Sequence, residues 1–150
     1  MPYKYCEVFG LLGYPIDLAN HEYPIKPYLP EDSVEQKLLS KKEDKRIIGV
    51  APFASFAGKN YPLDLMQNVI AYLQKDHIIY LFGGGINELN QIKVWENAYD
   101  SVVDVSSSFT LTQQINIINY IDVMISMDSA NGHIAANCGV PVLTIWGMTH

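Results

Sequence analysis

From Arg46 onward, short apolar runs alternate with longer segments in which apolar residues recur at helical spacing. The apolar runs are rich in β-branched residues, as is typical of strands buried on both faces of a parallel sheet. They predict strands at residues 47–53, 77–82, 102–105, 123–127 and 140–146. The segments between them predict helices near residues 63–74, 87–97, 111–120 and 132–137. This alternation predicts an α/β fold with a parallel five-stranded sheet flanked by helices.

Residues 1–44 differ from the rest because their middle part is dense in proline and tyrosine, which removes backbone donors and breaks periodicity. A helix is predicted at residues 3–12, and a second helix is predicted to open with the segment Pro30-Glu31-Asp32-Ser33 and to run to about Ser40. We therefore interpret residues 1–44 as a connector with short helices and residues 45–150 as one folded domain.

The stretch 122–147 joins two apolar runs through a predicted helix start. Asp128 and Ser129 are residue types that cap helices, and the small residues after them let the helix begin close to the strand. The first amides of a helix have no intrahelical partner and carry partial positive charge, so they bind phosphate without a cation. The last lysine or arginine of the chain is Lys93. A phosphate bound here therefore depends on amides of residues 129–132, helped by a lysine from elsewhere in the fold.

Other candidate residues follow the first two predicted strands, at the sheet edge where ligands bind in such folds. Lys59 lies after the first strand and is predicted to contact phosphate. The glycines 83–85 follow the second strand, where they let a ligand approach the backbone, and Glu88 accepts hydrogen bonds from ribose hydroxyls. The alternative is a tight glycine turn with an exposed carboxylate. A dinucleotide fingerprint is incomplete, because Glu88 stands where its third glycine belongs.

His133 lies in the first turn of the last predicted helix, whose positive end disfavours protonation of the imidazole. A neutral imidazole still donates one hydrogen bond to a phosphate or sugar oxygen. Two alternatives remain: His133 satisfies a neighbouring loop, or Asp128 serves only as a helix cap. The serine run 106–108 is interpreted as a solvated turn, and no Ser-His-Asp arrangement is evident.

Composition excludes several classes of function. The chain has 150 residues, 49% of them hydrophobic, which suits one domain. A net charge of -6 opposes nucleic acid as a partner. Cys6 and Cys138 do not stand at zinc-ligand spacing with the histidines, so we expect reduced thiols and no metal. No segment reaches the roughly twenty apolar residues that span a bilayer, and no signal segment follows Met1, so a cytoplasmic location is expected.

The segment DSANGHIAANCGVPVLTIWG is similar to a signature of the heptosyltransferases, glycosyltransferase family nine. RIIGVAPFASFAGKNYP and LFGGGINE resemble two further family segments in the same order, so that the resemblance covers residues 45–147. It implies a Rossmann-like nucleotide-sugar (donor) binding domain, one half of a GT-B fold, truncated at its carboxyl-terminal end. It also implies that Lys59 contacts the donor pyrophosphate and Glu88 the ribose, while Phe109 and Thr110 border the adenine.

The same resemblance implies roles for the residues at the start of the last predicted helix. Asp128 meets hydroxyls of the donor sugar, the amides of Ser129 and Ala130 cradle phosphate, and His133 assists at the phosphate end. Gly132 completes this donor-binding turn. The sequence departs from the signature at Ala130, where the family has glycine.

The family acts on the lipopolysaccharide inner core and uses ADP-heptose. The resemblance therefore implies the donor-binding half of an inverting, metal-independent glycosyltransferase that needs no cofactor. Its presumed base is an aspartate in an amino-terminal domain that also binds the lipopolysaccharide-type acceptor, so we expect no catalytic residue here and no activity of this chain alone. The parent enzyme is expected to be cytoplasmic or peripheral at the inner membrane. Two alternatives are a non-catalytic nucleotide-binding module and a GT-B type sugar-nucleotide epimerase.

Overall fold

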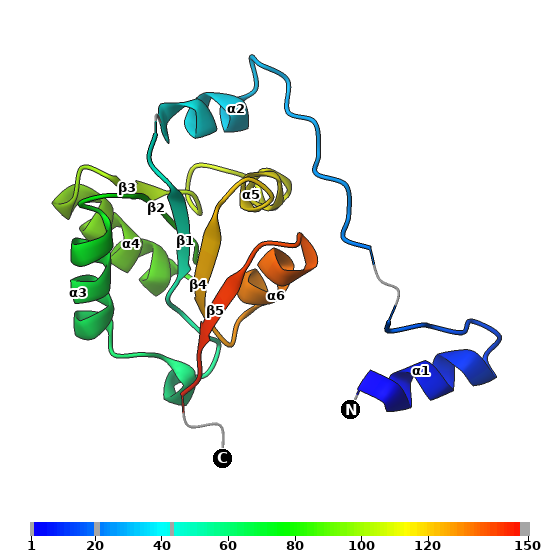
Figure 1. Ribbon diagram of the computed structural model, residues 1–150. Helices are drawn as coiled ribbons and strands as arrows, with labels where there is room; N and C mark the ends of the chain where they lie inside the picture. Colours follow the sequence, from blue (N-terminus) through cyan, green and yellow to red (C-terminus); the bar gives the residue numbers. More distant parts are fainter. Residues whose placement is uncertain (1, 20–21, 43, 148–150) are drawn as a thin grey trace.

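The structure is a computed structural model that describes residues 2–19, 22–42 and 44–147. Within these residues, five strands form one parallel sheet in the order β3-β2-β1-β4-β5 (Figure 1). The predicted α/β fold is confirmed, and the five predicted strands are present with their ends shifted by at most two residues. The strands are β1 (Ile47–Ala51), β2 (Ile78–Leu81), β3 (Val102–Asp104), β4 (Val123–Met127) and β5 (Val142–Ile145).

Helices cover both faces of this sheet. The helices α3 (Leu63–Leu73) and α4 (Ile86–Ala98) lie on one face, and α5 (Leu111–Ile118) and α6 (Ala130–Asn137) lie on the other (Figure 1). Each face has its own cluster of buried apolar side chains. Because β1 and β4 are central strands covered on both faces, nearly all of their residues are buried, which explains why their sequences are almost entirely apolar.

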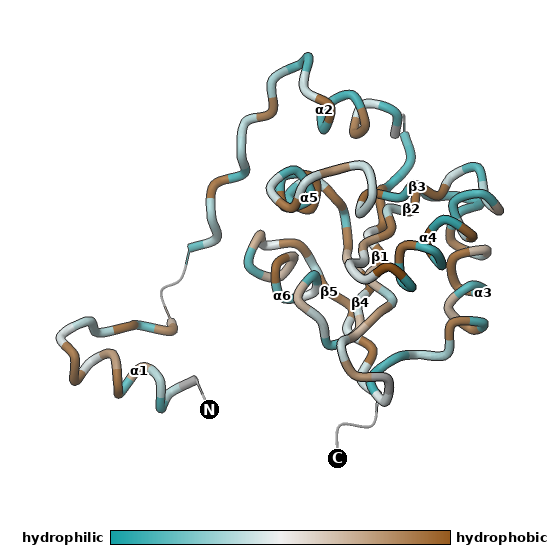
Figure 2. Tube along the Cα trace, turned by 180° about the vertical axis from the view of Figure 1, so that it is seen from behind, coloured by the Kyte–Doolittle hydropathy of each residue, from teal (hydrophilic) through white to brown (hydrophobic). Residues whose placement is uncertain are grey.

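The core under α3 and α4 reaches the carboxyl edge of the sheet. Its largest fully buried side chain is Trp95, whose ring stacks on Phe53 with centroids 6.1 Å apart. The indole Nε1 donates a hydrogen bond to Gln67 Oε1 at 3.3 Å. Figure 2 shows the hydrophobic stretches that run along the central strands. Since Phe53 follows β1, this core supports the loops that leave the strand ends.

The amino-terminal part contains two more helices. α1 (Pro2–Leu11) stands apart from the sheet, whereas α2 (Val34–Leu39) lies beside it (Figure 1). Tyr80 on β2 holds α2 in place, because its hydroxyl donates to the carbonyl oxygen of Leu38 at 3.2 Å. Burial raises the pKa of the Tyr80 hydroxyl, which keeps it a donor.

Of the predicted opening segment 30–33, only Ser33 belongs to the start of α2, and the part of the prediction that places residues 30–32 in the helix is wrong. The N–H of Ser33 donates to the carbonyl oxygen of Pro30 at 3.0 Å and closes a turn instead. Ser33 Oγ then accepts from the N–H of Gln36 at 3.1 Å, so the serine cap fixes the start of α2. A short 3₁₀ turn, η1 (Ser40–Lys42), follows. The division of the chain at residue 44 stays a prediction.

Candidate functional site

A hollow of about 500 Å³, here the main hollow, opens at the carboxyl ends of β1, β2 and β4. This is the sheet edge at which the sequence predicts a ligand. Its walls come from the loops after these strands and from three helices, with the lining residues Phe53, Ala54, Ser55, Phe82, Gly83, Gly84, Gly85, Glu88, Leu111, Gln114, Ser129, Ala130 and Asn131. Of the predicted site residues, the main hollow therefore brings together Glu88, Ser129 and Ala130.

The glycine turn 83–85 forms one wall of the main hollow. The N–H of Gly84 donates to Glu88 Oε2 at 2.8 Å, and the N–H of Gly85 donates to the same oxygen at 3.4 Å. Glu88 therefore holds the turn at the start of α4 and also lines the hollow. A Cβ atom at Gly83 would lie 2.9 Å from Ile92 Cδ1, so a larger residue here would have to displace the end of the Ile92 side chain.

The serine run next to this turn is only partly solvated. Ser107 and Ser108 are exposed, as predicted, but Ser106 is half-buried. Ser106 Oγ accepts a hydrogen bond from the N–H of Gly83 at 2.6 Å. The prediction of a solvated turn is therefore wrong for Ser106, which ties the loop after β3 to the glycine turn.

The start of α6 forms the opposite wall. Ser129 has the extended backbone of an N-cap residue, with φ −141° and ψ 164°, yet its side chain caps none of the described amides of α6. Behind this wall, a Cβ atom at Gly132 would lie 2.7 Å from the Oγ of the buried Ser126. The predicted close approach of this helix to its strand is thus confirmed, and glycine permits it.

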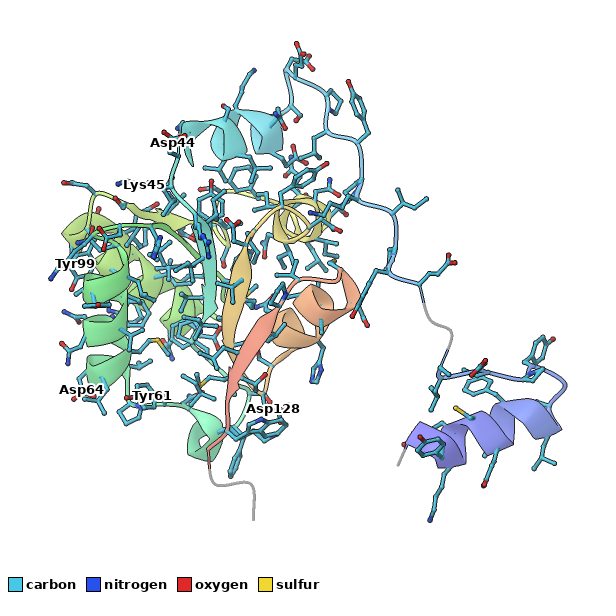
Figure 3. All side chains as sticks on the ribbon, viewed as in Figure 1. Asp44, Lys45, Tyr61, Asp64, Tyr99 and Asp128 are labelled. Carbon is cyan, nitrogen blue, oxygen red and sulfur yellow. The ribbon has the colours of Figure 1, made fainter. Side chains whose placement is uncertain are left out.

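Lys59 and Asp128 meet at the edge of the same wall. Lys59 ends the 3₁₀ turn η2 (Ala57–Lys59), and its Nζ lies 2.5 Å from Asp128 Oδ2. The hydrogen bond from Lys59 holds the pKa of Asp128 below its ordinary value, so this carboxylate stays ionised. The alternative in which Asp128 only caps the helix is wrong, because Ser129 occupies the N-cap position. Figure 3 shows Asp128 at the end of β4, beside the turn η2.

A smaller hollow of about 90 Å³ lies on the other side of the α6 start, against β5. Asp128, His133 and the exposed Trp146 line it, and Ser129 borders both hollows. His133 is largely exposed, and its Nε2 lies 3.5 Å from Asp128 Oδ1. The uncapped helix start therefore stands between a large hollow lined by glycines and a small hollow lined by a carboxylate, an imidazole and an indole.

Phe109 and Thr110 lie close to the main hollow but are not among the described residues that line it. Phe109 packs partly buried against the core under α5, and Thr110 is the N-cap of α5, where its Oγ1 accepts from the N–H of Gln113 at 3.4 Å. The neighbouring Leu111 and Gln114 do line the hollow. The role of Phe109 and Thr110 at an adenine stays a prediction.

Three polar residues of this region have no place in the sequence prediction. Gln114 Nε2 donates to the carbonyl oxygen of Phe109 at 2.8 Å and borders the main hollow. Asn60 Oδ1 accepts from the N–H of Ala54 at 2.7 Å and shapes the loop after β1. Ser126 bonds to Ser129. Only Ser126 leaves a signal in the sequence, as the single hydroxyl within the apolar run of β4.

Among the residues that the structure describes, no group of three or more His, Cys, Asp or Glu side chains is arranged to hold a metal ion. Within the same residues, no helix is both long and apolar enough to cross a bilayer.

A family model described as glycosyltransferase family 9 (heptosyltransferase) matches residues 4–150. The chain belongs to glycosyltransferase family 9. No curated protein sequence matches this family 9 chain significantly. Solved structures match it clearly, and they share its Rossmann-like fold at low sequence identity.

Two of these structures show the extent of the match. A glycosyltransferase family 9 protein from Veillonella parvula has a TM-score of 0.77 and 20% identity, covering 97% of this chain and 43% of its own. The E. coli heptosyltransferase WaaC with ADP has a TM-score of 0.64 and 19% identity, covering 84% of this chain and 41% of its own. The family 9 chain thus spans about two fifths of the length of these relatives.

Proposed function

We propose that this chain binds the nucleotide-sugar donor of a heptosyltransferase, ADP-heptose or a related compound. The observation that carries the proposal is the uncapped start of α6 between the two hollows. A diphosphate placed there has a nucleoside-sized space on one side and a small polar space on the other. The structure of WaaC, which shares the fold, was solved with ADP, and this supports the choice of nucleotide.

Each part of the donor has residues of matching chemistry. The main hollow takes the nucleoside, with the Glu88 carboxylate as an acceptor for ribose hydroxyls. The diphosphate lies over the amides of residues 129–132 and within reach of Lys59. The small hollow takes the sugar, where Asp128 accepts hydrogen bonds from its hydroxyls and His133 contacts the phosphate end. With Ala130 in place of glycine, residues 129–131 still line the main hollow.

The proposed reaction of the whole protein is inverting transfer of heptose to a lipopolysaccharide-type acceptor. Lys59 and the helix amides stabilise the departing ADP, so no metal ion or other cofactor is assigned. The two carboxylates at the site are poor candidates for the base, because Glu88 accepts from two amides and Asp128 pairs with Lys59. The proposal therefore assigns the base and the acceptor site to a domain outside this chain, in a cytoplasmic enzyme that acts at the inner membrane.

Isothermal titration calorimetry with ADP, ADP-heptose, GDP- and UDP-sugars tests this proposal. We expect ADP and ADP-heptose to bind the chain, and we expect the affinity to be unchanged by EDTA. Failure of every nucleotide to bind would contradict the proposal. A metal requirement would overturn its metal-independent part. Binding of a UDP-sugar with epimerisation by the longer protein would favour an epimerase, and binding without any turnover would favour a nucleotide sensor.

Replacing Asp128 with asparagine is expected to strengthen ADP binding by roughly two- to fivefold, because Lys59 no longer shares its charge with a carboxylate at the surface. The same change is expected to reduce the ratio of the ADP-heptose affinity to the ADP affinity, since asparagine is a weaker acceptor for sugar hydroxyls than a carboxylate. Titrations of ADP and ADP-heptose into both proteins measure the two effects separately. Weaker ADP binding by the variant would contradict the assigned role of Asp128.

A further inference from the structure

The hydroxyl of Ser126 is directed at the start of α6 from within the sheet. Ser126 lies on β4 and is fully buried. Its Oγ donates to the carbonyl oxygen of Met127 at 2.6 Å, which uses its only proton. In the 3.0 Å contact between Ser126 Oγ and Ser129 Oγ, the donor is therefore the Ser129 hydroxyl.

This contact distinguishes α6 from two other helices that begin with a hydroxyl residue. Ser33 Oγ accepts from the N–H of Gln36 at 3.1 Å, and Thr110 Oγ1 accepts from the N–H of Gln113 at 3.4 Å. Ser129 is also extended, but its φ of −141° differs from the φ of −62° at Ser33 and −63° at Thr110, and it makes no such bond within the described part of α6. The residue type at the cap therefore does not explain the difference, and Ser129 differs from the two caps in its φ angle and in its contact with Ser126.

We propose that Ser126 is a positioning residue that keeps the start of α6 uncapped for its ligand. By accepting the Ser129 proton, Ser126 turns the Ser129 hydroxyl away from the amides of Asn131 and Gly132, which an N-cap serine ordinarily satisfies. Those amides stay available to an oxygen of the donor diphosphate. The identity of this ligand rests on the proposed function, whereas the uncapped state itself does not.

The packing at Gly132 supports this role. A Cβ atom at residue 132 would lie 2.7 Å from Ser126 Oγ and 3.1 Å from Ser126 Cβ, so the first turn of α6 sits directly over the buried hydroxyl. Because the Ser129 backbone is already extended, as is typical of an N-cap residue, a released Ser129 hydroxyl is expected to reach these amides by rotation of its side chain. The cap and the ligand oxygen then compete for the same donors.

Amide hydrogen exchange followed by NMR on the ligand-free chain tests this role. In S126A, exchange at Asn131 and Gly132 is expected to slow by roughly fivefold, the factor that corresponds to about 1 kcal/mol for a serine cap. The double variant S126A/S129A is expected to exchange like the wild type. ADP binding is expected to weaken by a similar factor in S126A alone. Unchanged exchange in S126A, or slow exchange retained in the double variant, would overturn the proposal.

Two further variants keep the test decisive. S129A is expected to leave exchange at Asn131 and Gly132 unchanged, since its hydroxyl caps neither amide, and faster exchange would contradict the proposal even if S126A did not fold. S33A is the matched control for the readout, because loss of a true cap is expected to speed exchange at Gln36. If wild-type chain binds no ADP while exchange changes as expected, the proposed function fails and the positioning role stands. If the wild-type chain binds ADP but exchange in S126A does not change, the positioning role fails and the proposed function stands.

Discussion

Replacing Lys59 with alanine is expected to weaken ADP binding by roughly tenfold to a hundredfold, which corresponds to the loss of about 1.5–3 kcal/mol for a hydrogen bond between charged groups. Lys59 is the cation that the fold brings to the start of α6, through its 2.5 Å contact with Asp128. Its ammonium group has three donors, so it can keep the bond to Asp128 and still contact a phosphate oxygen. Calorimetric titration of the variant with ADP measures the loss.

Lys93 provides the matched control for this change. It too is ion-paired, with its Nζ 3.3 Å from Glu96 Oε2 and 3.6 Å from Asp104 Oδ2, but these partners lie on α4 and β3 and not at the start of α6. K93A is expected to leave ADP affinity unchanged. K59R should retain part of the affinity, because it keeps the charge. Equal losses in K59A and K93A would show a general effect of net charge and contradict a specific contact at Lys59.

Most of the sheet could be predicted from the sequence because strands buried on both faces consist of consecutive apolar residues. The residues of β1 and β4 are apolar almost without interruption, and glycine turns and prolines mark the ends of the elements. The small residues at the start of α6 likewise predicted its close approach to β4. Here local sequence and tertiary packing point to the same structure.

The parts that could not be predicted depend on contacts between distant residues. Lys59 and Asp128 are 69 positions apart, and the sequence indicated a phosphate contact for Lys59 but not its ion pair. Ser106 was assigned to solvent because its binding partner, the amide of Gly83, comes from another loop. The start of α2 is ambiguous for a local reason, since Pro30 and Ser33 both signal a helix start and only the bond of Ser33 to Gln36 decides between them.

Lys59, the glycine turn and the start of α6 lie at one edge of the sheet because the strand order brings their loops together. β1 lies between β2 and β4, so the loops that follow these three strands are neighbours at one sheet edge. Within the described residues, the main hollow is bounded by all three loops. The positions of the site residues therefore depend on the core that fixes these strand ends, and on Phe53 and Trp95 in particular.

Replacing Trp95 with alanine is expected to lower the free energy of unfolding by about 3–5 kcal/mol, the usual cost of removing a large aromatic side chain from a core. Trp95 has no exposed surface, stacks on Phe53, and uses its indole N–H in a bond to Gln67. The cavity left behind lies directly under Phe53, which lines the main hollow. Urea unfolding followed by circular dichroism measures the loss.

Two variants show whether the effect comes from packing in this core. W95F keeps an aromatic ring against Phe53 and is expected to lose less than W95A, since it leaves a smaller cavity. Trp146 is the other tryptophan of the chain and is 65% exposed, so W146A is expected to change the unfolding free energy by less than about 0.5 kcal/mol. A loss below about 1.5 kcal/mol in W95A, or one matched by W146A, would contradict the view that Trp95 anchors the strand ends on which the donor site is built.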